Sequence, residues 1–118
     1  MKRNMDLMRE ILLVCEKYEH GFAPQIVIDG YSPEEIGYHV FLLGEAGLAE
    51  VEPISAMGAA SPYARIKRLT WNGHEFLDAS RDKTIWEKTK TKVGEIGGVA
   101  LPLLMTLLAD EAKRKLGL

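Results

Sequence analysis

The chain has 118 residues, of which 47% are hydrophobic and 27% are charged; this is the balance of one folded domain and excludes a multi-domain or disordered chain. Lys and Arg number 15 against 17 Asp and Glu, so the net charge of −2 does not predict nucleic-acid binding. Cys15 is the only cysteine, which excludes an internal disulfide bond and favours a cytoplasmic protein. The longest uncharged run, residues 96–109, has 14 residues, fewer than the about 20 of a membrane-spanning helix.

The first predicted element is a helix over about residues 4–18. Met8, Ile11, Leu12 and Cys15 recur at the spacing of one helix face. We therefore expect this face in the core, with Cys15 as a core side chain. A short run of β-branched residues at 24–28 then predicts a small strand.

The clearest local signal marks the start of a second helix. Ser32 suits the capping position, Pro33 suits the first turn, and Glu35 has the spacing that returns the capping-box bond. Gly47 supplies the left-handed residue at which helices often stop. The sequence therefore predicts a helix between Ser32 and Gly47.

A hairpin and a third helix are expected next. Residues 48–54 and 63–69 read as two strands, joined by an eight-residue tip of small residues. Thr70 is a suitable N-cap residue just before Trp71, and one charged helix is predicted from there to about Val93.

The last predicted helix, residues 101–116, is apolar on more than one face. Such a helix needs two partners, so we expect it to pack on the first helix and against a second subunit. The organisation predicted is therefore a domain over 1–94 and a C-terminal helical segment over 95–118. The residues expected at an interface with a second subunit or another partner are Phe41, Leu101, Leu104, Met105 and Leu108.

Parts of the chain resemble known proteins. Residues 36–48 resemble the recognition-helix end of arsenical-resistance-type repressors, and residues 69–73 resemble the step from wing strand to following helix in winged repressors. Over the whole chain, residues 1–7, 38–40 and 68–78 look like a family of uncharacterised small bacterial and prophage-borne proteins. The resemblance implies a winged-helix-like fold and no established activity. Together with the predicted elements, it gives a fold that is mainly α with a small antiparallel β-hairpin and an added C-terminal helix.

The resemblance to repressors also implies DNA contact, but the sequence departs from the repressor pattern. The exposed reading positions hold Gly37, Tyr38, Phe41 and Gly44, and residues 31–48 contain three Glu and no Lys or Arg. The segment before Ser32 is short, so the supporting helix of a helix-turn-helix is expected to be missing or reduced to a turn. The residues expected to contact nucleic acid are Tyr38 and His39 on the helix and Arg65, Lys67 and Arg68 on the hairpin.

Catalytic chemistry is not expected from this chain. His20, His39 and His74 lie on separate elements, without the spacing of a metal site. No phosphate-binding loop, dinucleotide fingerprint or nucleophile elbow occurs in the sequence. We predict no enzymatic activity, no cofactor, no metal and no small-molecule substrate.

Two functions remain open from the sequence. The favoured one, by analogy of fold, is a small prophage-type regulator that binds double-stranded DNA as a homodimer. The alternative is a winged-helix protein-interaction module without DNA binding, which uses Phe41 and the terminal helix. Residues 1–50 carry a net charge of −5 and residues 51–118 a net charge of +3, so any DNA contact must depend on the second half.

Overall fold

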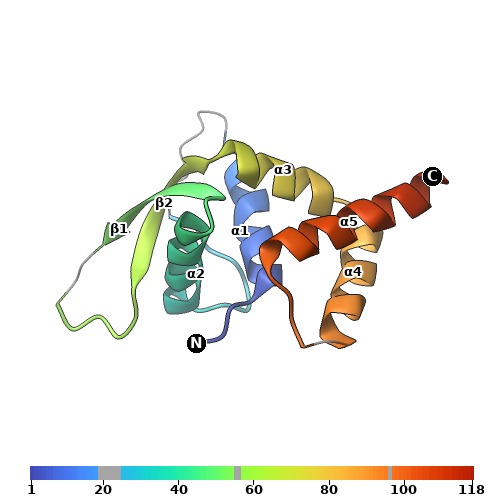
Figure 1. Ribbon diagram of the computed structural model, residues 1–118. Helices are drawn as coiled ribbons and strands as arrows, with labels where there is room; N and C mark the ends of the chain where they lie inside the picture. Colours follow the sequence, from blue (N-terminus) through green and yellow to red (C-terminus); the bar gives the residue numbers. More distant parts are fainter. Residues whose placement is uncertain (19–24, 55–56, 96) are drawn as a thin grey trace. The chain divides into compact units, whose positions relative to one another are not determined.

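The computed structural model describes residues 1–18, 25–54, 57–95 and 97–118. The described chain forms five helices and one antiparallel two-stranded hairpin, which confirms the predicted mainly α class with a small β-hairpin (Figure 1). The elements in chain order are α1 (Met5–Glu16), α2 (Pro33–Glu45), β1 (Ala49–Ile54), β2 (Tyr63–Leu69), α3 (Trp71–Ser80), α4 (Lys83–Glu95) and α5 (Leu101–Leu116).

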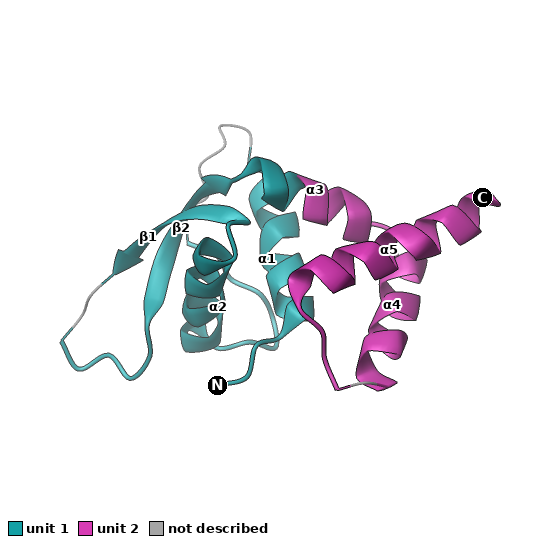
Figure 2. Ribbon diagram, in the orientation of Figure 1, with its two compact units in different colours: residues 1–74 teal, residues 75–118 magenta. Residues whose placement is uncertain are grey.

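The chain divides into two compact units, which we call unit 1 (Met1–His74) and unit 2 (Glu75–Leu118) (Figure 2). The boundary predicted after residue 94 stays a prediction. No described helix combines the length and the apolar character that crossing a membrane requires.

Helix α1 supplies much of the core of unit 1. Asn4 caps it, because the Asn4 side chain accepts a hydrogen bond from the backbone N–H of Leu7 over 3.2 Å. Burial raises the pKa of the Cys15 thiol to about 12, so Cys15 is a core side chain, as predicted, and not a reactive thiol. The buried residues of this helix are Leu7, Met8, Ile11, Leu12 and Cys15.

Helix α2 begins with the capping box that the sequence predicts. The Ser32 hydroxyl accepts from the Glu35 N–H over 3.1 Å, and the Glu35 carboxylate accepts from the Ser32 N–H over 3.2 Å. Gly47, just beyond the helix, has a φ of +73° and so provides the left-handed turn. These local bonds fix both ends of the helix that carries the candidate site.

The strand predicted over residues 24–28 is wrong for its described part, and Pro24 lies outside the described residues together with His20. Residues 25–28 pair with no other strand in the described chain. A turn follows at once, because the Tyr31 N–H donates to the Ile28 carbonyl over 3.3 Å and Gly30 has a φ of +89°. The run is therefore a short extended segment.

The hairpin contains a β-bulge. Glu50 pairs with Arg68 and Val51 pairs with Ile66, so Lys67 is the extra residue on β2. A bulge turns the strand locally, and both Lys67 and Arg68 are exposed.

The single helix predicted from Thr70 to Val93 is wrong, because the chain breaks it into α3 and α4. Asp82 accounts for the break, since its side chain accepts from the Ile85 N–H over 3.0 Å and so caps a new helix. Of the two tryptophans, Trp86 is buried edge-on to Phe76, with ring centroids 6.1 Å apart. Trp71 instead is 75% exposed.

In unit 2, α4 and α5 are joined by charged pairs. Glu111 of α5 is buried and accepts from Lys92 of α4, and Arg114 donates to the same Glu111 oxygen over 2.7 Å. These cations, Lys92 first, hold the pKa of the Glu111 carboxyl below its ordinary value. Lys115 pairs with Asp82 in the same way, and α5 spans the residues predicted for it.

Candidate interaction surface

Two glycines bring the hairpin of unit 1 against α2. A Cβ atom at Gly37 would lie 2.9 Å from the Cβ of Tyr63, and one at Gly44 would collide with the Val51 side chain. The seven-residue spacing of these glycines places them on one helix face. Two of the four positions that a repressor would expose for base reading are therefore covered by the chain's own hairpin.

The cations of the hairpin lie on the other face of β2. Ala64 and Ile66 are buried and share a cavity with the α2 residue Val40, whereas Arg65 and Lys67 are exposed. Side chains alternate between the two faces of a strand, so Arg65 and Lys67 are exposed on the solvent side of β2, although Arg65 also lines this cavity. Arg65, Lys67 and Arg68 are all exposed on β2, and their contact with nucleic acid stays a prediction.

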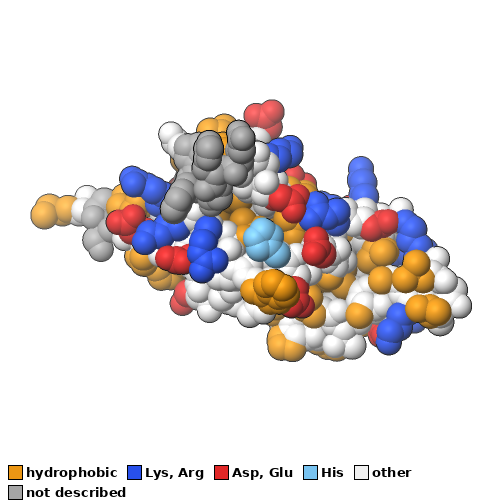
Figure 3. Space-filling model, turned by 90° about the horizontal axis from the view of Figure 1, so that it is seen from above, with side chains coloured by type: hydrophobic (Ala, Val, Ile, Leu, Met, Phe, Trp, Pro, Cys, Tyr) orange, Lys and Arg blue, Asp and Glu red, His pale blue; other side chains and the backbone are white. Residues whose placement is uncertain are grey.

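Carboxylates share this solvent face. The Arg68 Nε donates to Oε2 of Glu50 over 2.9 Å, and Lys67 Nζ lies 4.0 Å from Oε1 of the same Glu50. Glu52 is the cross-strand partner of Arg65. The face turned to the viewer in Figure 3 accordingly shows Lys and Arg beside Asp and Glu, without one continuous basic field.

Both ring nitrogens of His39 make hydrogen bonds within unit 1. It is 1% exposed, its Nδ1 lies 2.8 Å from the Glu35 carbonyl oxygen, and its Nε2 accepts from the Asn4 N–H over 2.9 Å. A carbonyl only accepts, so Nδ1 carries the proton. Tyr38 is half-buried, with its ring edge-on to His39 at a centroid distance of 5.8 Å. A nucleic-acid contact by His39 stays a prediction, and it would require both of these bonds to break.

Phe41 is half-buried and lies in the surface that the hairpin leaves open. It borders two hollows of about 660 and about 450 Å³, which also share Pro53, and a third hollow of about 370 Å³ shares Tyr63 with the first. We call these three adjoining hollows the Phe41 recess. Its lining consists of Pro33, Glu34, Phe41, Gly44, Glu45, Ala49, Glu50, Val51, Pro53, Ile54, Met57, Ala59, Ala60, Ser61, Pro62 and Tyr63.

The Phe41 recess was only partly predictable. Phe41 was expected at a contact surface, but Met57, Tyr63 and Glu45 were not. Met57 is fully exposed at the hairpin tip, where its apolar side chain is not buried by the fold. The spacing of Gly37 and Gly44 within one helix is the signal that would have located the covered face.

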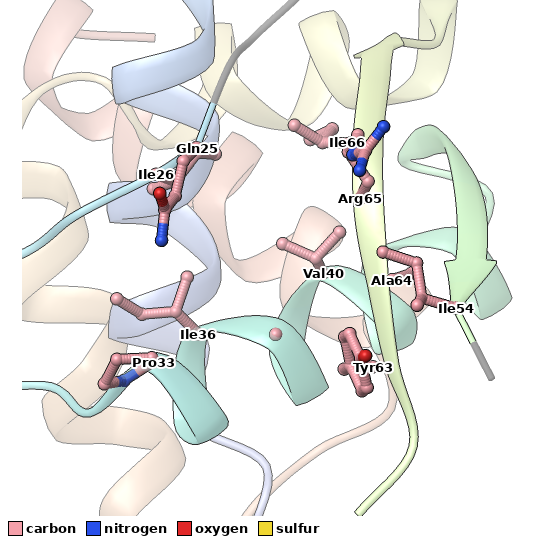
Figure 4. Close-up of a pocket in the computed structure, with 11 residues that line it drawn as sticks. Gln25, Ile26, Pro33, Ile36, Val40, Ile54, Tyr63, Ala64, Arg65 and Ile66 are labelled. Atoms are coloured by element: carbon pink, nitrogen blue, oxygen red, sulfur yellow. The ribbon is translucent and has the colours of Figure 1, made fainter. Parts of the chain in front are cut away.

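A second cavity, of about 600 Å³, lies between α2 and β2 (Figure 4). Ile36 and Val40 line it from α2, Ile26 lines it from the extended segment, and its polar members include Gln25 and Arg65. No carboxylate, histidine or cysteine is among its described lining residues. Most of the residues that line this space are apolar, and Tyr63 adds a phenol hydroxyl.

The residues expected at a subunit interface on α5 are only partly accessible. Leu104 and Leu108 are buried within the single chain, whereas Leu101 and Met105 are half-buried. The exposed leucines near α5 are Leu103, Leu116 and Leu118. A dimer itself stays a prediction, since one chain does not test it.

Comparison with known proteins places the chain in a family. The family model described as "Hypothetical protein (DUF2513)" matches residues 2–100. The chain belongs to this DUF2513 family. An "Uncharacterized protein" of Haemophilus influenzae Rd is 40% identical over 95 residues, which are 79% of each chain. Among solved structures there is no significant match.

Membership of the DUF2513 family confirms the predicted relationship to uncharacterised bacterial proteins. The match covers the whole Phe41 recess and the whole hairpin, and it ends before α5. The family description assigns no activity, so function must be argued from the surface itself. Among the described residues, no three His, Cys, Asp or Glu side chains group as metal ligands.

Proposed function

We propose that this DUF2513 protein is a winged-helix-like protein-interaction module that binds a partner protein through the Phe41 recess. The observation that carries the proposal is the packing of the hairpin over Gly37 and Gly44. This packing places two of the four expected reading positions against the chain's own hairpin. It also leaves an open apolar surface around Phe41, with Met57 fully exposed beside it.

Electrostatics support a protein partner over DNA. Unit 1 contains seven Lys and Arg against ten Asp and Glu, a net charge of −3. Glu50 engages Arg68 directly and lies at ion-pair distance from Lys67. A surface with this balance releases few counterions from a polyanion, and counterion release supplies most of the affinity for DNA.

Double-stranded DNA remains the second candidate partner, because Arg65, Lys67 and Arg68 are all exposed on one strand. A prophage-type regulator would contact phosphates with these three side chains. Three phosphate contacts correspond to a salt slope of about −2.7. A cytoplasmic location and a homodimer joined through α5 are further parts of the proposal.

Photo-crosslinking in the full chain tests the protein-interaction proposal. A photoreactive residue is placed at Met57, inside the recess, or at Val27, which is exposed but does not line the recess. We expect a discrete protein adduct from position 57 in the native cell extract and none from position 27. Phe41→Ala should remove that adduct, provided that its circular dichroism spectrum shows a folded chain.

A DNA-retention assay separates the two candidates. We expect the wild-type chain not to retain mixed duplex fragments at about 50 mM salt. Retention that falls steeply with salt and disappears in the triple variant Arg65→Ala, Lys67→Ala, Arg68→Ala would overturn the protein-interaction proposal in favour of DNA.

A further inference from the structure

We propose that the Phe41 recess binds residues 113–118 of a second copy of this chain. This inference rests on the proposed function and names the partner. The inference pairs two surface features that have complementary chemistry. One is the acidic recess, and the other is the basic end of α5 with its exposed leucines.

The recess is apolar with negative charge at its border. The charged side chains among its described lining residues are Glu34, Glu45 and Glu50, and no Lys or Arg lines it. Glu34 accepts a hydrogen bond from the Ser61 hydroxyl over 2.8 Å, and Glu50 pairs with Arg68. Glu45 is exposed and makes no ion pair within the described residues, so it is available to a cation.

The end of α5 has the complementary chemistry. Leu116 is 74% exposed and Leu118 is 86% exposed, directly after the cations Lys113, Arg114 and Lys115. Arg114 and Lys115 are paired within unit 2, whereas Lys113 is exposed and has no ion pair in the described chain. This end therefore presents two apolar anchors and at least one free cation.

The helix end is also held in one conformation. Gly117 has a φ of +78°, its N–H donates to the Arg114 carbonyl over 3.1 Å, and the Leu118 N–H donates to the Lys113 carbonyl over 2.8 Å. These bonds form the capping motif of a left-handed glycine. A segment that is ordered before it binds loses less conformational entropy on binding.

Charge favours a second copy as the occupant. Unit 1 has a net charge of −3 and unit 2 a net charge of +1, so unit 1 of one copy attracts the basic end of another. The three hollows, of about 370, 450 and 660 Å³, fall in the range of about 300–1,000 Å³ typical of binding pockets.

The association is expected to be weak. A contact of six residues buries far less than the about 1,200 Å² of a stable interface, so we expect dissociation in the micromolar range or above. Exposed ion pairs contribute to it, so the affinity should fall as salt rises.

Two measurements on purified material test the inference. Light scattering of the full chain over about 1 µM to 1 mM should show a monomer passing to a dimer, at lower concentration in about 50 mM than in about 500 mM salt. A fluorescent synthetic peptide of residues 111–118 should bind the full chain and shift the NMR signals of Phe41 and Ile54.

Charge reversal supplies the specific variants. Glu45→Lys should weaken both dimer formation and peptide binding about fivefold. A peptide or second chain that carries Lys113→Glu should bind the Glu45→Lys chain with restored affinity. Asp29→Lys is the matched control, because Asp29 is exposed in unit 1 and does not line the recess. Leu116→Ser with Leu118→Ser should abolish association while leaving the melting temperature unchanged.

Three outcomes would overturn the inference. If the peptide binds but the full chain stays monomeric at about 1 mM, the recess serves another basic protein, and the proposed function stands. If Asp29→Lys weakens binding as much as Glu45→Lys, the attraction is not local to the recess. If duplex DNA displaces the peptide and is itself retained, both the inference and the proposed function are wrong.

Discussion

The backbone N–H of Asn4 donates to Nε2 of His39 over 2.9 Å, and this bond fastens the start of α1 to the middle of α2. The other ring nitrogen of His39 donates to the Glu35 carbonyl, so the imidazole joins two helices as a neutral ring. His39, which the sequence analysis expected to contact DNA, thus connects two helices within unit 1.

Replacing His39 should destabilise the protein strongly. His39→Ala removes a buried imidazole, opens a cavity and leaves the half-buried Asn4 N–H without this partner, so we expect a loss of about 2–4 kcal/mol in the free energy of unfolding. Urea denaturation followed by circular dichroism measures this loss. His74→Ala is the control, since His74 is exposed on α3 and its removal should change stability by less than about 0.5 kcal/mol. Equal losses would contradict the bridging role.

Adding a methyl group at Gly44 should separate the hairpin from α2. Gly44→Ala places a Cβ against the Val51 side chain, and overpacking of this kind costs about 1–3 kcal/mol. Gly94→Ala is the matched helical control, because nothing lies within 4 Å of the added atom and alanine is the better helix former by about 0.8–1 kcal/mol. Thermal melts should therefore shift in opposite directions. Val51→Ala should partly rescue Gly44→Ala, and a failure to do so would place the strain elsewhere.

Thr89 of α4 offers a stabilising substitution. Its hydroxyl is buried and has no hydrogen-bond partner among the residues that the structure describes. Valine has nearly the same shape and removes the desolvation penalty of this unpaired group. Thr89→Val should raise the free energy of unfolding by about 1 kcal/mol. The nearby Thr91 donates to the Glu87 carbonyl over 3.0 Å and is exposed, so Thr91→Val should leave stability almost unchanged. A destabilised Thr89→Val would show that the hydroxyl has a partner in solution.

Acid should weaken unit 2 through Glu111. Lys92, and then Arg114, lower the pKa of Glu111 below its ordinary value of 4.5, so the carboxylate binds protons less readily in the folded than in the unfolded chain. The resulting stability is present above about pH 4.5 and is lost as the pH falls through the lowered pKa. Melting temperatures between about pH 7 and pH 3 should therefore fall less steeply for Glu111→Gln than for the wild type. Glu95→Gln, an exposed change on α4, should keep the wild-type slope.

Much of the secondary structure was predictable because its signals are local. Ser32 and Glu35 bond each other within one turn, and α5 occupies the predicted residues 101–116. The break between α3 and α4 is also local, but a capping Asp82 within a charged run does not stand out from the other charged residues of the sequence. The strand expected near Ile28 failed for a different reason: a strand exists only with a paired neighbour, and β-branched residues alone do not provide one.

The sequence by itself determined α1, α2, α5, the hairpin and the acidic character of the first half, because capping residues, turn residues and charges act through chain neighbours. Only the tertiary structure decided which residues of α2 pack against other parts of unit 1. Gly37 and Gly44 turn toward Tyr63 and Val51 because the hairpin folds back on α2. His39 likewise turns toward Asn4, which is 35 residues away. Which face of a helix is covered depends on the partners that folding brings to it, and the spacing of residues along one helix does not specify those partners.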